Sequence, residues 1–193
     1  FATVVVESPD STVAEQLQQL AIVDSVKWIW KGNLRVPAEE KREDRFVSED
    51  EPLHNEYGYS YKQIKMLNGT KLHEAGFRGE GMRVAVIDAG FMNADRVSAF
   101  DSLRLLGTHN VVFPGKSVFV GDDHGTKVLS CLAADIPGVM VGTAPKASYL
   151  LLKSEDSDSE YPVEEDYWTA AVEYADSAGV DVISSSLGYF AFD

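Results

Sequence analysis

The sequence predicts an α/β fold in which helices flank a parallel sheet. From about residue 57 onward, short apolar runs alternate with segments of helical periodicity. Strands that alternate with helices are typical of parallel sheets with right-handed crossovers. Residues 84–87 are all apolar, and they are followed by Asp88 and, two positions later, by Gly90. An uninterrupted apolar run of this kind indicates a parallel strand that is buried on both faces.

The first 36 residues predict a small β-α-β unit of their own. Residues 3–6 are β-branched and apolar, which favours a strand. Asp10 or Ser11 can cap a helix with apolar residues on one face. Residues 26–30 are again rich in strand-forming side chains. We therefore expect residues 1–36 to form a unit that precedes the main sheet.

Residues 37–54 are a charged run without periodicity, which predicts a solvated linker between that unit and residues 55–193. The elements expected in the longer part are, in order, a helix at 63–72, strands at 83–87 and 110–113, a helix at 124–134, a strand at 148–152, a helix at 166–178 and a strand at 180–185. Gly179 suits the end of the last helix, because glycine is favoured just past helix C-termini.

The composition excludes several classes of protein. The 193 residues include 17 Lys and Arg but 31 Asp and Glu, so the net charge is −14. Nucleic acids and anionic membranes need clustered basic residues, and we expect neither as a partner. No apolar run approaches the roughly 20 residues of a membrane-spanning helix. The single cysteine cannot form an intrachain disulfide.

Asp88 and His124 are the candidate catalytic pair. Asp88 ends the buried strand, and His124 follows 36 residues later at the start of an expected helix. The carboxyl ends of parallel strands meet at one edge of a sheet, where open α/β folds bind their ligands. A carboxylate and an imidazole from this edge are two members of a nucleophilic triad. In such a triad the histidine moves the proton, and the acid fixes its tautomer.

Four short motifs follow one another along residues 55–193. They are Tyr57-Gly58 to Gly76-Phe77-Arg78-Gly79 ahead of the Asp88 strand, His124-Gly125-Thr126-Lys127-Val128, Gly142-Thr143-Ala144-Pro145, and Ser186-Leu187-Gly188. In this order they resemble the N-terminal part of the catalytic domain of subtilisin-like serine proteases (subtilases). The resemblance implies a serine endopeptidase that hydrolyses peptide bonds through an Asp-His-Ser triad, with Asp88 and His124 as catalytic residues.

The serine motif of that family lies beyond its Ser-Leu-Gly strand, and residues 1–193 contain no serine in such a turn. We therefore interpret the chain as an incomplete subtilisin-like parallel sheet and expect it, as given, to be inactive. The resemblance implies that Ser186, Leu187 and Gly188 bind the extended backbone of a protein or peptide substrate. An incomplete sheet exposes an edge, which predicts self-association.

The resemblance also bears on the remaining segments. Residues 1–36 resemble the propeptide of the family, which binds the catalytic domain in cis, and a structural lobe of the same domain is the alternative. The acidic residues 155–162 either favour basic substrate residues or are simply solvated. The resemblance implies a secreted or extracytoplasmic location. No cofactor is expected; calcium is an alternative, but the residues of the family's main calcium site do not map onto recognisable positions here.

Other classes of function remain as alternatives. The first is a non-catalytic protein that binds peptides or a partner on the same fold. The second is a metal site made from Asp88, Asp122, Asp123 and His124, whose oxygen and imidazole ligands suit Zn or Mn; it lacks a second histidine at helical spacing. A nucleotide-binding domain is the weakest alternative, because neither G-x-G-x-x-G nor a Walker loop is present.

Overall fold

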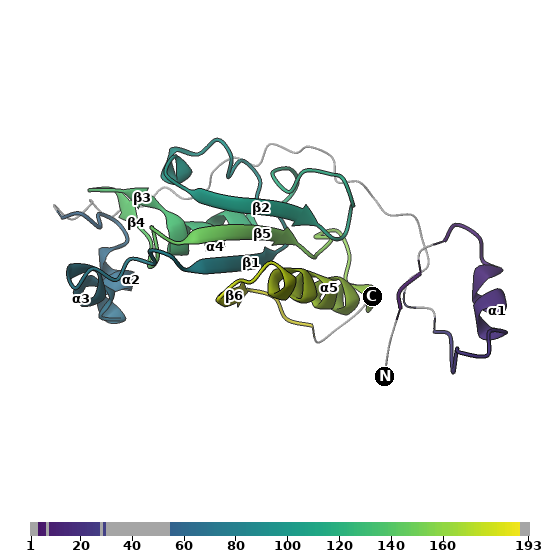
Figure 1. Ribbon diagram of the computed structural model, residues 1–193. Coiled ribbons are helices and arrows are strands. Elements are labelled where there is room, and N and C mark those ends of the chain that lie inside the picture. The colour runs from purple at the N-terminus through teal and green to yellow at the C-terminus, as the bar shows by residue number, and fades with distance from the viewer. Residues whose placement is uncertain (1–3, 7, 28, 30–54, 190–193) are drawn as a thin grey trace.

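The computed structural model describes residues 4–6, 8–27, 29 and 55–189, and these residues contain one parallel sheet. Its strands, in spatial order, are β2 (Arg104–Asn110), β5 (Ser148–Lys153), β1 (Arg83–Asp88) and β6 (Val182–Ser185). All three neighbouring pairs run parallel, and Figure 1 shows the four arrows pointing the same way. The α/β fold with a parallel sheet and flanking helices is therefore confirmed.

The strand register brings polar residues together at the carboxyl edge of the sheet. Asp88, the last residue of β1, is paired with Lys153 at the end of β5. Lys153 is paired in turn with Asn110 at the end of β2. An acid, an amine and an amide thus lie level with one another across three strands. Open α/β sheets bind their ligands at this edge.

Each face of the sheet carries its own apolar core. On one face, side chains of β1 and β5 pack with α4 (His124–Ala133) around Val84, Val86, Leu129, Tyr149 and Leu151. On the other face they pack with α5 (Val163–Ser177) around Ala85, Ile87, Leu150, Leu152, Ala171 and Ala175. Successive strand residues point to opposite faces, so a strand covered on both sides must be apolar at every position. Burial of each large aliphatic side chain contributes about 1.5–3 kcal/mol.

Smaller elements complete the main body. They are α2 (Tyr61–Met66), α3 (Gly69–Glu74), the 3-10 helix η1 (Ser98–Phe100) and an antiparallel pair of short strands, β3 (Asp135–Ile136) and β4 (Met140–Val141). The single helix expected at 63–72 is two helices. Asn68 separates them with a φ of 55°; asparagine adopts this left-handed conformation more readily than most residues.

Two expected boundaries in this part of the chain are wrong. A strand is expected at 110–113, but the structure has β2 at Arg104–Asn110, so the observed strand ends at the residue where the predicted one begins. β2 lies at the edge of the sheet, with Leu105 and Leu106 almost half exposed, so its sequence lacks the apolar pattern of a buried strand. Asn110 ends it, and its side-chain oxygen accepts a hydrogen bond from the Phe113 N–H at 2.8 Å. The last helix begins at Val163, immediately after Pro162, three residues earlier than expected.

The N-terminal β-α-β prediction is also corrected. Among residues 4–6, 8–27 and 29, only the helix forms, as α1 (Val13–Gln18), and it buries none of its residues. Residues 4–6, 26, 27 and 29 are not strands, and Val4 and Ile22 are largely exposed. A strand needs a neighbour for its ladder of hydrogen bonds, and none is present in the described part of this segment. Strand propensity alone therefore did not suffice to form strands in the described part of this segment.

The expected linker at 37–54 lies outside the described residues, so the division of the chain at residues 36 and 54 stays a prediction. Across the part of the chain that the structure describes, no helix has both the length and the apolar character needed to cross a membrane.

Candidate functional site

Asp88 and His124 meet where β1 ends and α4 begins. Nδ1 of His124 lies 2.7 Å from Oδ1 of Asp88. The Asp88 side chain is fully buried, whereas 52% of the His124 side chain is exposed. Since Nδ1 faces the carboxylate, Nε2 is the ring nitrogen that remains for exchanging a proton with a substrate. The structure thus joins a sheltered acid to an accessible base.

Backbone hydrogen bonds hold both members of this pair. The Ala89 N–H donates to Oδ1 of Asp88 at 2.8 Å, so the carboxylate is tied to the turn that follows β1. The His124 N–H donates to Oδ1 of Asp122 at 2.7 Å. This bond satisfies a donor in the first turn of α4 that has no partner within the helix. The imidazole of His124 is therefore attached to a helix N-terminus whose position is fixed by hydrogen bonds.

Gly125 allows α4 to begin close against the end of β1. A Cβ atom at this position would lie 2.5 Å from the Gly90 carbonyl oxygen and 2.9 Å from Cβ of Asp88. Both distances are too short for real carbon contacts, so a larger residue would push the helix away from the strand. Thr126 also holds the start of α4 close to the segment after β1, because its Oγ1 donates a hydrogen bond to the Met92 carbonyl at 2.9 Å. The residues after His124 thus serve the geometry of the pair.

The surroundings alter the proton affinity of both groups. Burial raises the pKa of Asp88, and its hydrogen bond with His124 opposes this change. The hydrogen bond to Asp88 raises the pKa of His124, against the effect of partial burial. An imidazole with a raised pKa is a stronger base, and the carboxylate stabilises the imidazolium that proton uptake creates. Among the described residues, Oδ2 of Asp88 is buried without a hydrogen-bond partner.

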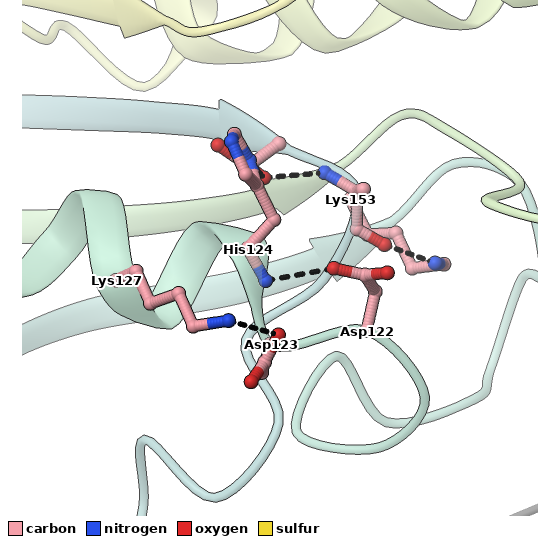
Figure 2. A network of polar contacts seen from close by, with 7 residues as sticks. Asp122, Asp123, His124, Lys127 and Lys153 are labelled. Carbon is pink, nitrogen blue, oxygen red and sulfur yellow. Dashed lines mark hydrogen bonds and ion pairs between the residues drawn. The ribbon is translucent and has the colours of Figure 1, made fainter. Parts of the chain in front are cut away.

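Lys153 is a further polar residue of this site. Its side chain is only 3% exposed, and its Nζ donates to the Ala89 carbonyl, next to Asp88 (Figure 2). Burial lowers the pKa of this amine, while nearby carboxylates, chiefly Asp156 and Asp122, oppose that change. Sequence reasoning missed Lys153. The available signal was that the apolar run 149–152 ends at a lysine, as the run 84–87 ends at Asp88.

The three residues expected to bind substrate lie apart from this network, directly after β6. Strand β6 pairs with β1 on one side, through Val182 to Ser185, and is an edge of the described sheet. Ser186 and Gly188 are exposed, and Leu187 packs against the apolar core beneath α5. A Cβ at Gly188 would meet no atom within 4 Å. The backbone of this segment is therefore open to an incoming chain.

The carboxylates beside His124 are turned to different partners. Asp122 accepts the His124 N–H, and Oδ1 of Asp123 lies 2.9 Å from Nζ of Lys127, as Figure 2 shows. Within the described residues, no group of three or more His, Cys, Asp or Glu side chains is arranged to hold a metal ion. The alternative metal site at Asp88, Asp122, Asp123 and His124 does not form there.

The sequence is similar to those of known serine proteases. The chain is 32% identical over 147 residues to Subtilisin E of Bacillus subtilis (strain 168), a match that covers 74% of the chain and 36% of that protein. It is 31% identical over 133 residues to the Major intracellular serine protease of the same strain, covering 65% of the chain and 40% of the relative. The chain thus spans well under half the length of these curated relatives. No protein-family model matches it.

One solved structure shows the same fold. The MycP3 protease from the type VII (ESX-3) secretion system superposes with a TM-score of 0.50 and 22% sequence identity. The match covers 64% of this chain and 36% of that structure.

Proposed function

Because the chain is related to the subtilisin-like serine proteases, we propose that it carries the acid and the base of a serine endopeptidase. His124 is the general base and Asp88 the acid that orients it. The observation that supports this most directly is the 2.7 Å contact between Nδ1 of His124 and Oδ1 of a fully buried Asp88. The third member of the triad is a serine that residues 1–193 do not contain in a suitable turn.

The proposed chemistry follows from the two ring nitrogens. Nε2 of His124 takes the proton of the serine hydroxyl as that oxygen attacks the carbonyl carbon of the substrate. The imidazolium then gives the proton to the departing amine, and a water molecule repeats the cycle on the acyl-enzyme. Asp88 keeps the Nδ1–H hydrogen bond throughout and stabilises the positive ring without taking its proton. Because the nucleophile is missing, residues 1–193 alone should hydrolyse no peptide bond.

We propose that the backbone at Ser186, Leu187 and Gly188 pairs with an extended protein or peptide substrate. Main-chain pairing of this kind tolerates many sequences, and neighbouring pockets supply the selectivity. The open position of Ser186 and Gly188 after β6 supports this role. An extracytoplasmic location stays a prediction from the family; one relative of the chain bears the name of an intracellular protease.

The test uses the longer protein from its natural source and a fluorophosphonate probe, which reacts only with an activated serine. We expect intact mass to rise by one adduct, and His124→Ala to abolish the reaction. His109→Ala is the matched control, because His109 is an exposed histidine that stacks on Tyr174 instead, and it should react like the wild type. A longer protein that forms no adduct would contradict the proposal and favour a non-catalytic binding protein.

A further inference from the structure

A second group of acids, two of them buried, lies near the Asp88–His124 pair. It follows the end of β5 and runs into the first turn of α5; we name it the acidic cluster, and it consists of Glu155, Asp156, Glu160 and Glu164. Glu164 is 2% exposed and Asp156 is 7% exposed. Glutamate and aspartate are rarely buried this fully unless they are paired. The burial of Glu164 therefore needs a physical explanation other than solvation.

Glu164 is the strongest indication that a ligand is missing. Its Oε1 atom is buried and has no hydrogen-bond partner among the described residues. The charged groups that act on it are Glu160, Glu155 and Asp156, which are all acidic. A buried carboxylate among like charges costs free energy that only a cation or a set of donors can offset.

The proton affinities of the cluster agree with this geometry. Burial and the charge of Glu160 raise the pKa of Glu164 to about 8. The same two causes raise the pKa of Glu155 to about 7. Both acids thus hold protons near neutral pH that a bound cation would displace.

Among the described residues, no basic group acts on Glu164. Lys153 is the basic residue on the adjoining strand end, but its Nζ already donates to the Ala89 carbonyl. A bare metal ion does not suit the site either, because no three acidic, histidine or cysteine side chains in the described structure are grouped to hold one. A guanidinium group is larger, planar and able to bridge carboxylates that lie too far apart to share a metal.

The position of the cluster connects it with the catalytic pair. The charge of Glu155 acts on both His124 and Asp88. Tyr189, which comes directly after Gly188, lies close enough to Glu155 and Glu164 for both to raise its pKa, although burial is the main cause. Glu155 is therefore electrostatically coupled both to the catalytic pair and to Tyr189, the residue after the exposed segment that follows β6.

We propose that Glu164 and Glu155 bind the basic side chain, arginine in preference to lysine, of the peptide that lies beside His124. This inference rests on the proposed function, because the peptide is the substrate of that site. The guanidinium pairs with both carboxylates and displaces their protons. Residues 155–162 either select basic substrate residues or are solvated, and the buried, unpartnered Oε1 atom of the neighbouring Glu164 supports selection.

The test measures peptide binding to the 193-residue chain by amide chemical shifts. The probes are acetylated alanine tetrapeptide amides with one arginine at each position in turn, and the same peptides with citrulline, which has the shape of arginine without its charge. At about pH 9, above the pKa of both acids, we expect one arginine peptide to bind about tenfold more tightly than its citrulline counterpart, the size of one charge-assisted hydrogen bond.

Variants connect that preference with the cluster. Glu164→Gln combined with Glu155→Gln should bind the two peptides equally, whereas Glu165→Gln, an exposed acid in the same first helical turn, should keep the preference. The amide spectrum of each variant shows whether it is folded. Equal binding of all arginine and citrulline peptides by the wild type would overturn the proposal, as would a preference that survives in the folded double variant.

The outcome is separable from that of the proposed function. The His124→Ala variant should keep the arginine preference, because it changes the base and leaves the cluster intact. A fluorophosphonate adduct on the longer protein without any arginine preference would overturn only the role of the cluster. An arginine preference without an adduct would overturn the proteolytic function and would leave a site for basic peptides.

Discussion

Asp88 and Glu164 are both buried carboxylates near the same edge of the sheet, yet their surroundings differ. Asp88 accepts hydrogen bonds from His124 and from the Ala89 N–H. Each carboxylate has one buried oxygen without a hydrogen-bond partner in the described structure, but every charged group that acts on Glu164 is itself acidic. Burial raises the pKa of both groups. The fold therefore offsets the cost of burying Asp88 more fully than the cost of burying Glu164.

The difference arises from the elements that supply the partners. Strand β1 and helix α4 bring a carboxylate and an imidazole together through rigid backbone, so Oδ1 of Asp88 has its partners within the chain. The segment between β5 and α5 brings further acids to Glu164, and a backbone hydrogen bond from Tyr161 offsets only part of their effect on its pKa. The α5 N-terminus favours negative charge, but that effect is small beside the cost of burying a carboxylate. The proposed proton transfer depends on the first site, and the proposed cation binding depends on the second.

The largest effect is expected from removing the charge of Asp88. Asp88→Asn keeps the shape of the side chain but no longer holds the catalytic tautomer of His124, so the rate of labelling by fluorophosphonate in the longer protein should fall by roughly 10⁴-fold. Time courses of intact mass measure this rate. Glu165→Gln removes an exposed acid and should label at the wild-type rate; an equal fall in both variants would contradict the role of Asp88.

The contact between β1 and α4 can be broken without touching a charge. Gly125→Ala places a Cβ 2.5 Å from the Gly90 oxygen, and forced packing of this kind costs about 1–3 kcal/mol. Urea unfolding of the 193-residue chain should show this loss in the free energy of unfolding. Gly188→Ala is the control, because no atom lies within 4 Å of its Cβ position. Equal stability of the two variants would refute the close approach.

Glu164 should make the protein less stable as the pH rises. Its folded-state pKa of about 8 lies above the ordinary value of 4.5, so between these values the folded state keeps a proton that the unfolded state releases. Stability is then lost as the pH rises through this window and levels off above about 8. Glutamine cannot ionise, so Glu164→Gln should melt higher than the wild type above that pH.

Thermal unfolding of the 193-residue chain at several pH values measures this difference. Each kcal/mol regained should raise the melting temperature by roughly 2–4 °C, and the gain should shrink toward zero near the ordinary pKa of 4.5. Glu165→Gln should show no comparable dependence. A Glu164→Gln variant that melts below the wild type at high pH would show that the carboxylate has a stabilising partner after all.

The smallest effect concerns the titration of His124. The hydrogen bond to Asp88 raises its pKa above the ordinary value of 6.5, so the pair stabilises the folded state below that pH. This contribution is lost as the pH rises through the folded-state pKa. Proton NMR should therefore find a lower His124 pKa in Asp88→Asn than in the wild type. The same pKa in both proteins would mean that the charge of Asp88 does not act on the ring.

Local patterns in the sequence were enough to predict the centre of the fold. The apolar run 84–87 specified β1, because a strand buried on both faces needs apolar residues at every position. Strands near 148–152 and 180–185 and the helix that starts at His124 were predicted for similar reasons. The proximity of Asp88 and His124 followed from topology, since the ends of parallel strands share one edge of the sheet.

The sequence was insufficient to predict strands and buried polar groups whose formation depends on residues distant in the chain. Residues 3–6 and 26–30 have strand propensity, but their described members pair with nothing, and the edge strand β2 lacks an apolar pattern because solvent reaches much of its surface. Lys153 and Glu164 look like surface residues in the sequence. The sequence by itself determined which segments are apolar and where the polar groups follow them. Only the tertiary structure decided which polar groups are buried and which find a partner, because burial and pairing depend on residues that are distant in the chain.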